Sequence, residues 1–214
     1  MINFYSHRAR DSHSFKDNSK EAINFVLNKS YIAGVELDIR LTKDKKLVIY
    51  HNPFVILNNK IKVIYETKYV DLYKANIYRL KDILAFLNTN KRIILEVKYE
   101  NKFNKKDADL IIDEVSKYNL DIYLCSFNTK LIKYIKKNSN LKCGIIIGSI
   151  INKFKSKLDF CLMKYSLIFK IPKYEYYIWT INDNNLLNKI KKKTKNINII
   201  TDNAYKLNNI HQSH

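Results

Sequence analysis

Two carboxylates interrupt an apolar, strand-like stretch at residues 34–52, GVELDIRLTKDKKLVIYHN. Glu36 and Asp38 are two residues apart, so their side chains project from the same face of a strand. Glu96 and Lys98 repeat this spacing in the later stretch RIILEVK. Carboxylates buried close together repel one another and take up protons unless a cation compensates them. An all-oxygen set of Glu36, Asp38 and Glu96 therefore predicts one divalent cation, Mg²⁺ or Ca²⁺, with Mn²⁺ also compatible.

The alternative to a metal is a buried ion network in which Glu36 and Asp38 pair with Arg40 and Lys98. Such a network explains a single pair of carboxylates as well as a metal does. The same spacing on two separate strands, with histidines at neighbouring strand ends, favours the metal.

Two histidines follow predicted strands, His7 after the first and His51 after the segment LVIYH. A lone histidine at a strand end is more often a structural residue than a catalyst. Two of them beside a predicted metal site suggest a proton donor and a proton acceptor that work near neutral pH.

The length of 214 residues allows one sizeable hydrophobic core, so we expect a single domain over 1–207 and a mobile C-terminal tail over 208–214. Neither a membrane-spanning run nor a signal peptide is apparent, and a cytoplasmic location is the default expectation. The three cysteines, Cys125, Cys143 and Cys161, lie in apolar segments and are expected to be reduced core residues.

The chain is strongly basic, with 39 Lys and Arg against 20 Asp and Glu and a formal net charge of +19. Such a charge often indicates a nucleic-acid partner. Here the excess is spread along a chain rich in Asn, Ile and Tyr, residues of A/T-rich codons, so genome composition explains much of it and no nucleic-acid partner is expected. A positive field would still concentrate an anionic substrate, and contact with a membrane surface is left open.

Apolar, β-branched runs alternate with helical patterns along the chain, which is typical of a parallel sheet covered by helices. Eight principal strands, with LVIYH as a return segment beside the second, predict a compact (β/α)₈ TIM barrel. The spacing after the strand at 161–168 leaves too few residues for a full crossover, so one crossover helix is expected to be shortened or missing. The expected strands are 2–6, 34–41, 47–51, 92–98, 121–127, 143–148, 161–168, 176–181 and 197–201, and the expected helices are 18–30, 79–89, 104–118, 128–138, 150–158 and 183–193.

An ordered set of motifs across nearly the whole chain resembles the glycerophosphodiester phosphodiesterase family. That family shows His-Arg-Gly, Pro-Glu-Asn, Glu-Leu-Asp, Leu-Thr-Lys-Asp, His-Asp, Glu-x-Lys, Ser-Phe-Asp/Asn, Trp-Thr-Val-Asn and Ile-Thr-Asp-Pro. The corresponding stretches here are HRA at 7–9, KDN at 16–18, ELD at 36–38, LTKD at 41–44, HN at 51–52, LEVK at 95–98, SFN at 126–128, IWTIN at 178–182 and IITDN at 199–203.

The resemblance implies a TIM-barrel phosphoric diester hydrolase of lipid and glycerol metabolism, which releases glycerol 3-phosphate and an alcohol from a small glycerophosphodiester. It implies the roles of the individual residues as well. Glu36, Asp38 and Glu96 would hold the cation, His7 and His51 would be the acid and the base in an order left open, Arg8 and Lys98 would bind the phosphate, and Trp179 would contact the substrate.

The sequence departs from the family pattern at several positions. Ala9 replaces a glycine, Asp17 shortens a glutamate, Asn52 replaces the common aspartate, and the segment over 53–79 is shorter than the usual insertion. Two rivals follow: a lysophospholipase D or sphingomyelinase D-like enzyme acting on membrane lipids, and a basic binding protein that kept the barrel without its chemistry. The oligomeric state is not predicted.

Overall fold

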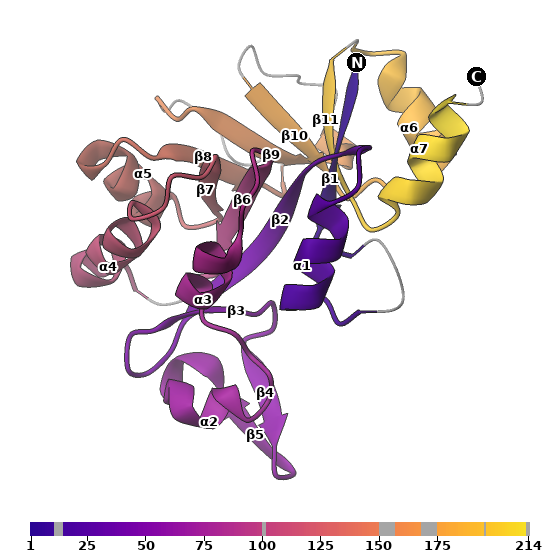
Figure 1. The fold of residues 1–214 in the computed structure, drawn as a ribbon. Coiled ribbons are helices and arrows are strands. Elements are labelled where there is room, and N and C mark those ends of the chain that lie inside the picture. The colour runs from indigo at the N-terminus through magenta and orange to yellow at the C-terminus, as the bar shows by residue number, and fades with distance from the viewer. Residues whose placement is uncertain (11–14, 100–101, 150–156, 168–174, 195, 213–214) are drawn as a thin grey trace.

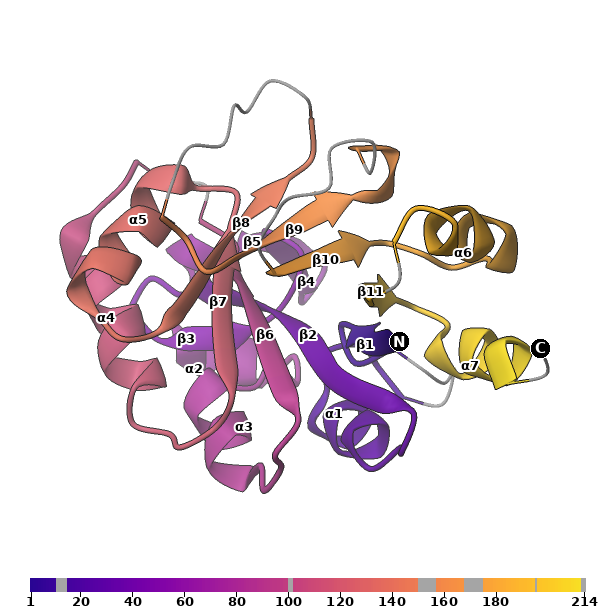
Figure 2. The same ribbon diagram turned by 90° about the horizontal axis from the view of Figure 1, so that it is seen from above.

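The computed structural model describes residues 1–214 except 11–14, 100–101, 150–156, 168–174, 195 and 213–214. Eight parallel strands form a closed ring in the order β1-β11-β10-β9-β8-β7-β6-β2, and a parallel pairing of β1 with β2 closes it (Figures 1 and 2). The predicted (β/α)₈ TIM barrel is confirmed. Its strands are β1 (Ile2–His7), β2 (Ile32–Leu41), β6 (Arg92–Val97), β7 (Ile122–Ser126), β8 (Lys142–Ile147), β9 (Phe160–Lys164), β10 (Glu175–Trp179) and β11 (Ile197–Thr201).

Helices lie outside the ring, as Figure 2 shows for α1 beside β2 and for α6 and α7 beside β10 and β11. Several begin at a residue whose side chain accepts a backbone N–H of the first turn, such as Ser19 for α1 and Asn128 for α5. Such caps satisfy donors that the helix itself leaves unpaired. The described helices are α1 (Lys20–Leu27), α2 (Tyr69–Tyr73), α3 (Leu80–Phe86), α4 (Lys105–Val115), α5 (Thr129–Asn138), α6 (Asn184–Lys191) and α7 (Ala204–Gln212).

Side chains of strand β2 point alternately to the helix layer and to the barrel interior, so the strand contributes to both the apolar core and the site. Val35, Leu37 and Ile39 are buried in the apolar layer between the strands and the helices. Glu36 and Asp38 lie on the opposite face of the strand, which points into the barrel. A sequence of alternating apolar and acidic residues therefore places its carboxylates inside the ring.

The amino-terminal half of the barrel interior is filled by aromatic side chains. Tyr5, Tyr123, Phe160 and Tyr177 form one buried cluster, and the Arg92 guanidinium lies 3.9 Å from the centre of the Tyr123 ring. This packing closes that end of the barrel. Space for a ligand is left at the carboxyl-terminal ends of the strands, where TIM-barrel active sites lie.

The long connection between β2 and β6 begins with β3 (Leu47–Ile49), which pairs antiparallel to β2 with Ile39 opposite Ile49. This pairing confirms the predicted return segment. The chain then forms the hairpin β4 (Phe54–Leu57) and β5 (Lys60–Val63), the 3₁₀ helix η1 (Ile64–Glu66) and α2. We call residues 53–76 the rim lobe, which projects from the barrel in Figure 1.

Three expected boundaries differ from the structure or lie outside its description. The helix expected over 150–158 falls mostly on residues that are not described. Strand β9 ends at Lys164 and gives way to the 3₁₀ helix η2 (Tyr165–Leu167), the helical element described between β9 and β10, which agrees with a shortened crossover.

The domain was expected to end at residue 207, a position that lies within α7, and this helix continues through Gln212. Leu207 is fully buried with Ala204 and Phe4 against the outer face of β1. This apolar contact holds α7 on the barrel, and residues 208–212 extend the same helix. Among the described residues, no helix is both long and apolar enough to cross a bilayer.

Candidate active site

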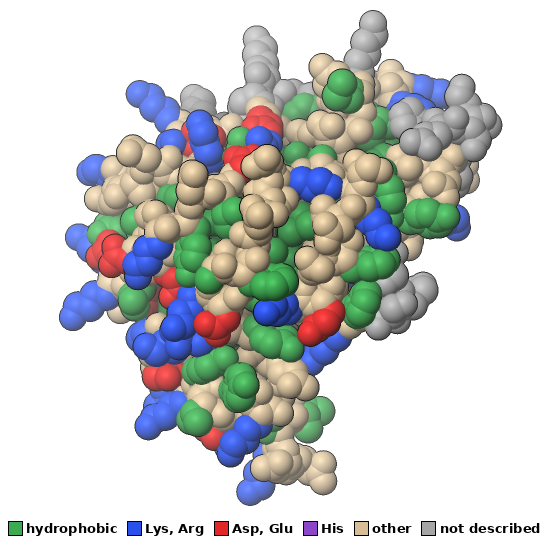
Figure 3. All heavy atoms as spheres, in the orientation of Figure 1, with side chains coloured by type: hydrophobic (Ala, Val, Ile, Leu, Met, Phe, Trp, Pro, Cys, Tyr) green, Lys and Arg blue, Asp and Glu red, His purple; other side chains and the backbone are tan. Residues whose placement is uncertain are grey.

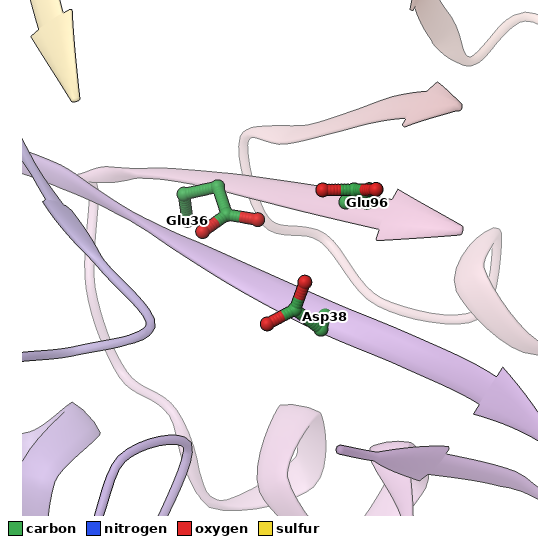
Figure 4. Close-up of side chains that lie close together, drawn as sticks. All are labelled: Glu36, Asp38 and Glu96. Carbon is green, nitrogen blue, oxygen red and sulfur yellow. The ribbon is translucent and has the colours of Figure 1, made fainter. Parts of the chain in front are cut away.

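The three predicted carboxylates meet inside the mouth of the barrel. Glu36 and Asp38 project from β2 and Glu96 from the neighbouring β6, where Asp38 and Glu96 are paired in register (Figure 4). One carboxylate oxygen from each residue lies within 4.8 Å of the other two, and all three residues are buried. Such an arrangement of oxygens fits a hard divalent cation.

The negative charge of the three carboxylates is not fully compensated by the basic side chains around them. Burial, together with the charges of Asp38 and Glu96, raises the pKa of Glu36 well above its ordinary value. Burial also raises the pKa of Glu96, although Lys98 opposes that shift. The Oε1 atom of Glu36 is buried and has no hydrogen-bond partner among the described residues. An unpaired buried acceptor of this kind is what a bound cation would satisfy.

Two cations of the chain contact the cluster from the side. The Nζ atom of Lys98 lies 2.6 Å from Glu96 Oε1 and 3.2 Å from Asp38 Oδ1, and Arg8 Nε lies 3.4 Å from Asp38 Oδ2. The Arg40 guanidinium donates to the backbone carbonyl of His51 at 3.0 and 2.6 Å. Part of the alternative ion network is therefore present, through Lys98, but it leaves Glu36 Oε1 without a partner.

His7 is held by a polar chain at the end of β11. Its Nδ1 lies 2.7 Å from Asp202 Oδ1, and Asn182 donates to the other oxygen of Asp202 at 2.7 Å. Burial works against ionisation of Asp202, but the contacts with His7, Asn182 and Arg10 lower its pKa below the ordinary value. With Nδ1 engaged by Asp202, the other ring nitrogen, Nε2, lies 3.8 Å from Glu36 Oε2 on the cavity side.

His51 reaches the same cavity from the return segment after β3. Arg40 fixes its carbonyl, and the Asn52 side-chain oxygen lies 2.9 Å from His51 Nδ1. Burial lowers the pKa of His51, although the Asp38 charge and the Asn52 contact oppose the shift. A lowered pKa favours the neutral imidazole, which is the form that accepts a proton.

The turn after β1 has left-handed backbone at Arg8 and Ala9, with φ values of 55° and 56°. Glycine adopts this conformation without strain, which is the physical reason for the glycine of the family pattern at Ala9. The turn nevertheless forms, and the Arg8 backbone N–H donates to Glu36 Oε2 at 3.3 Å. Asp17 pairs with Arg10 beside this turn, and Asn18 donates to Asp38 Oδ2 at 3.2 Å.

These residues surround a cavity of about 270 Å³ with a polar side and an apolar side. The Trp179 ring lies edge-on to Phe127, with ring centres 6.3 Å apart. The polar side is lined by His7, Arg8, Glu36, His51, Glu96 and Lys98, and the apolar side by Phe127, Ile146, Leu162, Trp179 and Ile200. Every predicted site residue lines the cavity except Asp38, which contributes to the carboxylate cluster beside it.

The polar residues that hydrogen-bond to the site residues were not assigned a role in the sequence analysis. Asp202 and Asn182 follow strands and were recognisable as strand-end residues, but their bonds to each other and to His7 depend on the ring closing. Asn18 belongs to the KDN stretch, and its contact with Asp38 depends on the fold of the turn after β1. Phe127 was visible only as part of SFN.

The fold and the site together define a TIM-barrel protein whose mouth carries a carboxylate cluster that could hold a metal ion. Residues 7–212 match a family model described as the glycerophosphoryl diester phosphodiesterase family, and the chain belongs to that family. The match confirms the resemblance that the motifs predicted.

Solved structures agree with the fold. A glycerophosphodiester phosphodiesterase from Thermotoga maritima has a TM-score of 0.80 at 21% identity, with 98% of each chain covered. A putative glycerophosphodiester phosphodiesterase from Galdieria sulphuraria has a TM-score of 0.82 at 14% identity, over 99% of this chain and 98% of that one. An Oleispira antarctica phosphodiesterase, solved in complex with the product sn-glycerol-3-phosphate, has a TM-score of 0.79 at 16% identity, over 98% and 96% of the chains.

A curated relative, an uncharacterized protein of Mycoplasma genitalium, is 26% identical over 134 residues. The alignment covers 54% of this chain and 57% of that protein, so it spans little more than half of the curated relative.

Proposed function

We propose that the protein hydrolyses glycerophosphodiesters to glycerol 3-phosphate and an alcohol. The observation that carries the proposal is that two histidines and the basic side chains of Arg8 and Lys98 line one cavity, with the cluster of three buried carboxylates at its wall. The Oleispira phosphodiesterase, which shares the fold, was solved with sn-glycerol-3-phosphate bound, and this supports the substrate class.

One divalent cation, Mg²⁺ or Ca²⁺ or alternatively Mn²⁺, would be held by Glu36, Asp38 and Glu96. When bound, it would stabilise negative charge on a phosphoryl oxygen. Arg8 and Lys98 line the cavity beside the carboxylates and would bind the remaining phosphoryl oxygens, because their charges match the growing negative charge in the transition state.

His51 is the proposed general base. Its lowered pKa favours the neutral imidazole, which can remove a proton from the attacking group, either water or a neighbouring glycerol hydroxyl. Attack by the hydroxyl expels the alcohol and leaves a cyclic glycerol phosphate, which water must then open to give glycerol 3-phosphate. His7 is the proposed general acid, which protonates the departing alcohol from Nε2. The Asp202 carboxylate at Nδ1 balances the positive charge that a proton-donating imidazole carries.

Lysophospholipids or sphingolipids are the second candidate substrates. They are favoured by the apolar side of the cavity, where Phe127 and Trp179 offer a surface to an alkyl chain or head group. Activity on lysophosphatidylcholine above that on glycerophosphocholine would decide for this candidate. A barrel that only binds its ligand is disfavoured, because loss of catalysis would be expected to damage at least one of His7, His51 and the three carboxylates.

The proposal is tested by release of glycerol 3-phosphate from glycerophosphocholine and from an analogue whose leaving group is p-nitrophenol. His51→Ala removes the base and should slow both reactions by about 10²–10⁴-fold. His7→Ala removes the acid and should slow the first reaction by a similar factor, but the second far less, because p-nitrophenolate leaves without a proton.

Circular dichroism and thermal melting of each variant control for folding. A wild type without activity on any glycerophosphodiester contradicts the proposed function. Equal losses of His7→Ala on both substrates contradict the assignment of the acid.

A further inference from the structure

The β4–β5 hairpin of the rim lobe turns an entirely apolar face outward. Phe54 is paired with Val63, and Ile56 with Ile61, across the two strands. Directly opposed residues share one face of a hairpin, so these four side chains form one surface. Ile56 is 66% exposed and Ile61 is 71% exposed. Clustered apolar exposure of this kind marks an interaction site more often than single exposed residues do.

The hairpin is held in this orientation. Its turn residues Asn58 and Asn59 both have positive φ, 49° and 58°, which is the two-residue turn that matches the twist of a hairpin. The opposite face carries Val55 and Leu57, which pack against the small core of the lobe formed by Val48, Ile64, Leu72 and Ile77. The four apolar side chains of the outer face are therefore exposed, while Val55 and Leu57 anchor the opposite face, which also carries Lys60 and Lys62.

Charge on the hairpin is exclusively positive. Lys60 and Lys62 are the charged residues between His51 and Tyr65, and both are exposed. In Figure 3 the projecting lobe shows hydrophobic and basic side chains side by side. Lys60 and Lys62 are paired with Leu57 and Val55, so they leave the hairpin on the side opposite Ile61 and Val63. When the apolar face enters the headgroup region of an anionic lipid surface, the long lysine side chains stay at the charged boundary behind it.

The hairpin stands at the rim of the catalytic cavity. His51 lines that cavity, Pro53 precedes β4, and the Pro53 carbonyl accepts the N–H of Ile64 at 2.9 Å at the base of the hairpin. Lys98 lines the catalytic cavity and also a small cavity beneath the hairpin base that Pro53 and Val63 line. If the hairpin contacts a surface, the mouth of the barrel therefore lies close to that surface.

We propose that the face formed by Phe54, Ile56, Ile61 and Val63 docks the protein on an anionic lipid surface. A second copy of the chain fits this face less well, because each copy carries a formal charge of +19 and copies repel one another. The proposal concerns binding and does not rest on the proposed catalysis.

The test is sedimentation of the full chain with phosphatidylcholine vesicles that contain or lack phosphatidylglycerol. The wild type should bind the anionic vesicles and be released by salt. Ile61→Ser should weaken this binding about tenfold, because one exposed isoleucine no longer enters the bilayer. Leu110→Ser, the same change at an exposed leucine on α4, should have no effect.

Charge is tested by reversing two lysines. Lys60→Glu with Lys62→Glu should weaken binding to the anionic vesicles at least about tenfold, whereas Lys133→Glu with Lys137→Glu, the same reversal on the exposed face of α5, should weaken it much less. Hydrolysis of water-soluble glycerophosphocholine, measured in parallel, should be unchanged in the Ile61 and Leu110 variants, which separates failure of docking from failure of catalysis.

The docking proposal is overturned if the wild type does not bind anionic vesicles or if Ile61→Ser and Leu110→Ser bind equally. It is also overturned if light scattering finds a dimer that Ile61→Ser dissociates, because the face would then be an interface between copies.

Discussion

Glu36 is the residue whose surroundings depend most on a bound cation. Its Oε1 has no partner among the described residues, and its pKa is raised by burial and by the charges of Asp38 and Glu96. A carboxyl with a raised folded-state pKa stabilises the fold below its unfolded pKa, and that stability is lost as the pH rises through the folded pKa. At neutral pH the metal-free protein therefore carries an electrostatic penalty at this position.

Glu36→Gln should relieve this penalty and abolish metal binding together. We expect the metal-free variant to melt no lower than the metal-free wild type at pH 7. Addition of Mn²⁺ at a hundred times its Kd should stabilise the wild type by about 2.7 kcal/mol and leave the variant unchanged. Differential scanning calorimetry with and without the ion measures both effects.

Glu21→Gln makes the same substitution at an exposed carboxylate in the first turn of α1 and serves as the control. Its response to Mn²⁺ should equal that of the wild type. A metal-free Glu36→Gln variant that is strongly destabilised would favour the buried ion network over the metal.

The pH dependence of hydrolysis should follow the protonation of His51, the proposed general base. Burial lowers its pKa, so kcat/KM should rise with pH through a value below the ordinary pKa of about 6.5. Asn52→Asp places a carboxylate beside His51 Nδ1 and favours the imidazolium. The acid limb of the pH profile should then move to higher pH by about one unit.

The control for this change is Asn88→Asp, at an exposed position in the loop before β6. It should leave the pH profile of glycerophosphocholine hydrolysis where it is in the wild type. An acid limb that stays in place in Asn52→Asp would show that His51 is not the group that titrates there.

The site residues with chemistry of their own were predictable, because Glu36, Asp38 and Glu96 are out of place in apolar strands and His7 and His51 end strands. Their placement around one cavity agrees with that prediction, while their roles stay predictions. Asp202 and Asn18 were not assigned, since an Asp or Asn after a strand is common and only closure of the ring brings Asp202 to His7.

Strand β8 carries Gly144, whose lack of a side chain leaves room for an aromatic ring inside the barrel. A Cβ atom added at Gly144 would lie 2.4 Å from Phe160 Cε2. Phe160 belongs to the aromatic cluster that fills the amino-terminal half of the interior. A methyl group at residue 144 would therefore force the Phe160 ring or the strand to shift.

Gly144→Ala should lower the free energy of unfolding by about 1–3 kcal/mol through overpacking. Gly148→Ala is the matched control, because an added Cβ there would meet Phe127 at 3.5 Å, an ordinary contact. Urea denaturation of both variants measures the difference. Phe160→Leu in the Gly144→Ala background should recover part of the loss, and equal stability of the two alanine variants would contradict the packing argument.

The barrel strands were predictable because continuous apolar runs alternate with amphipathic helices. The hairpin was missed, although Asn58-Asn59 between two apolar runs is a hairpin signal, since β5 alternates lysine with isoleucine and valine and is exposed throughout. Helix α7 was missed because its apolar positions are few, and it is held by the contacts of Ala204 and Leu207 with β1.

For the whole molecule, a net charge of +19 should attract anionic substrates over a distance that salt shortens. The value of kcat/KM for glycerophosphoglycerol, which has a net charge of −1, should fall as ionic strength rises. That for glycerophosphocholine, whose choline cancels the phosphate charge, should fall much less. Equal salt dependence of the two substrates would show that the overall charge plays no part in substrate capture.

In the proposed mechanism, the carboxylate cluster at the barrel mouth makes phosphodiester hydrolysis dependent on a metal ion. This dependence is measured as release of glycerol 3-phosphate from glycerophosphocholine by the wild type and by Glu96→Gln, before and after EDTA and after restoring Mg²⁺, Ca²⁺ or Mn²⁺. We predict that EDTA abolishes the wild-type activity, that at least one of the three ions restores it, and that none restores activity in Glu96→Gln. Undiminished release of glycerol 3-phosphate in EDTA would show that hydrolysis does not need a metal ion.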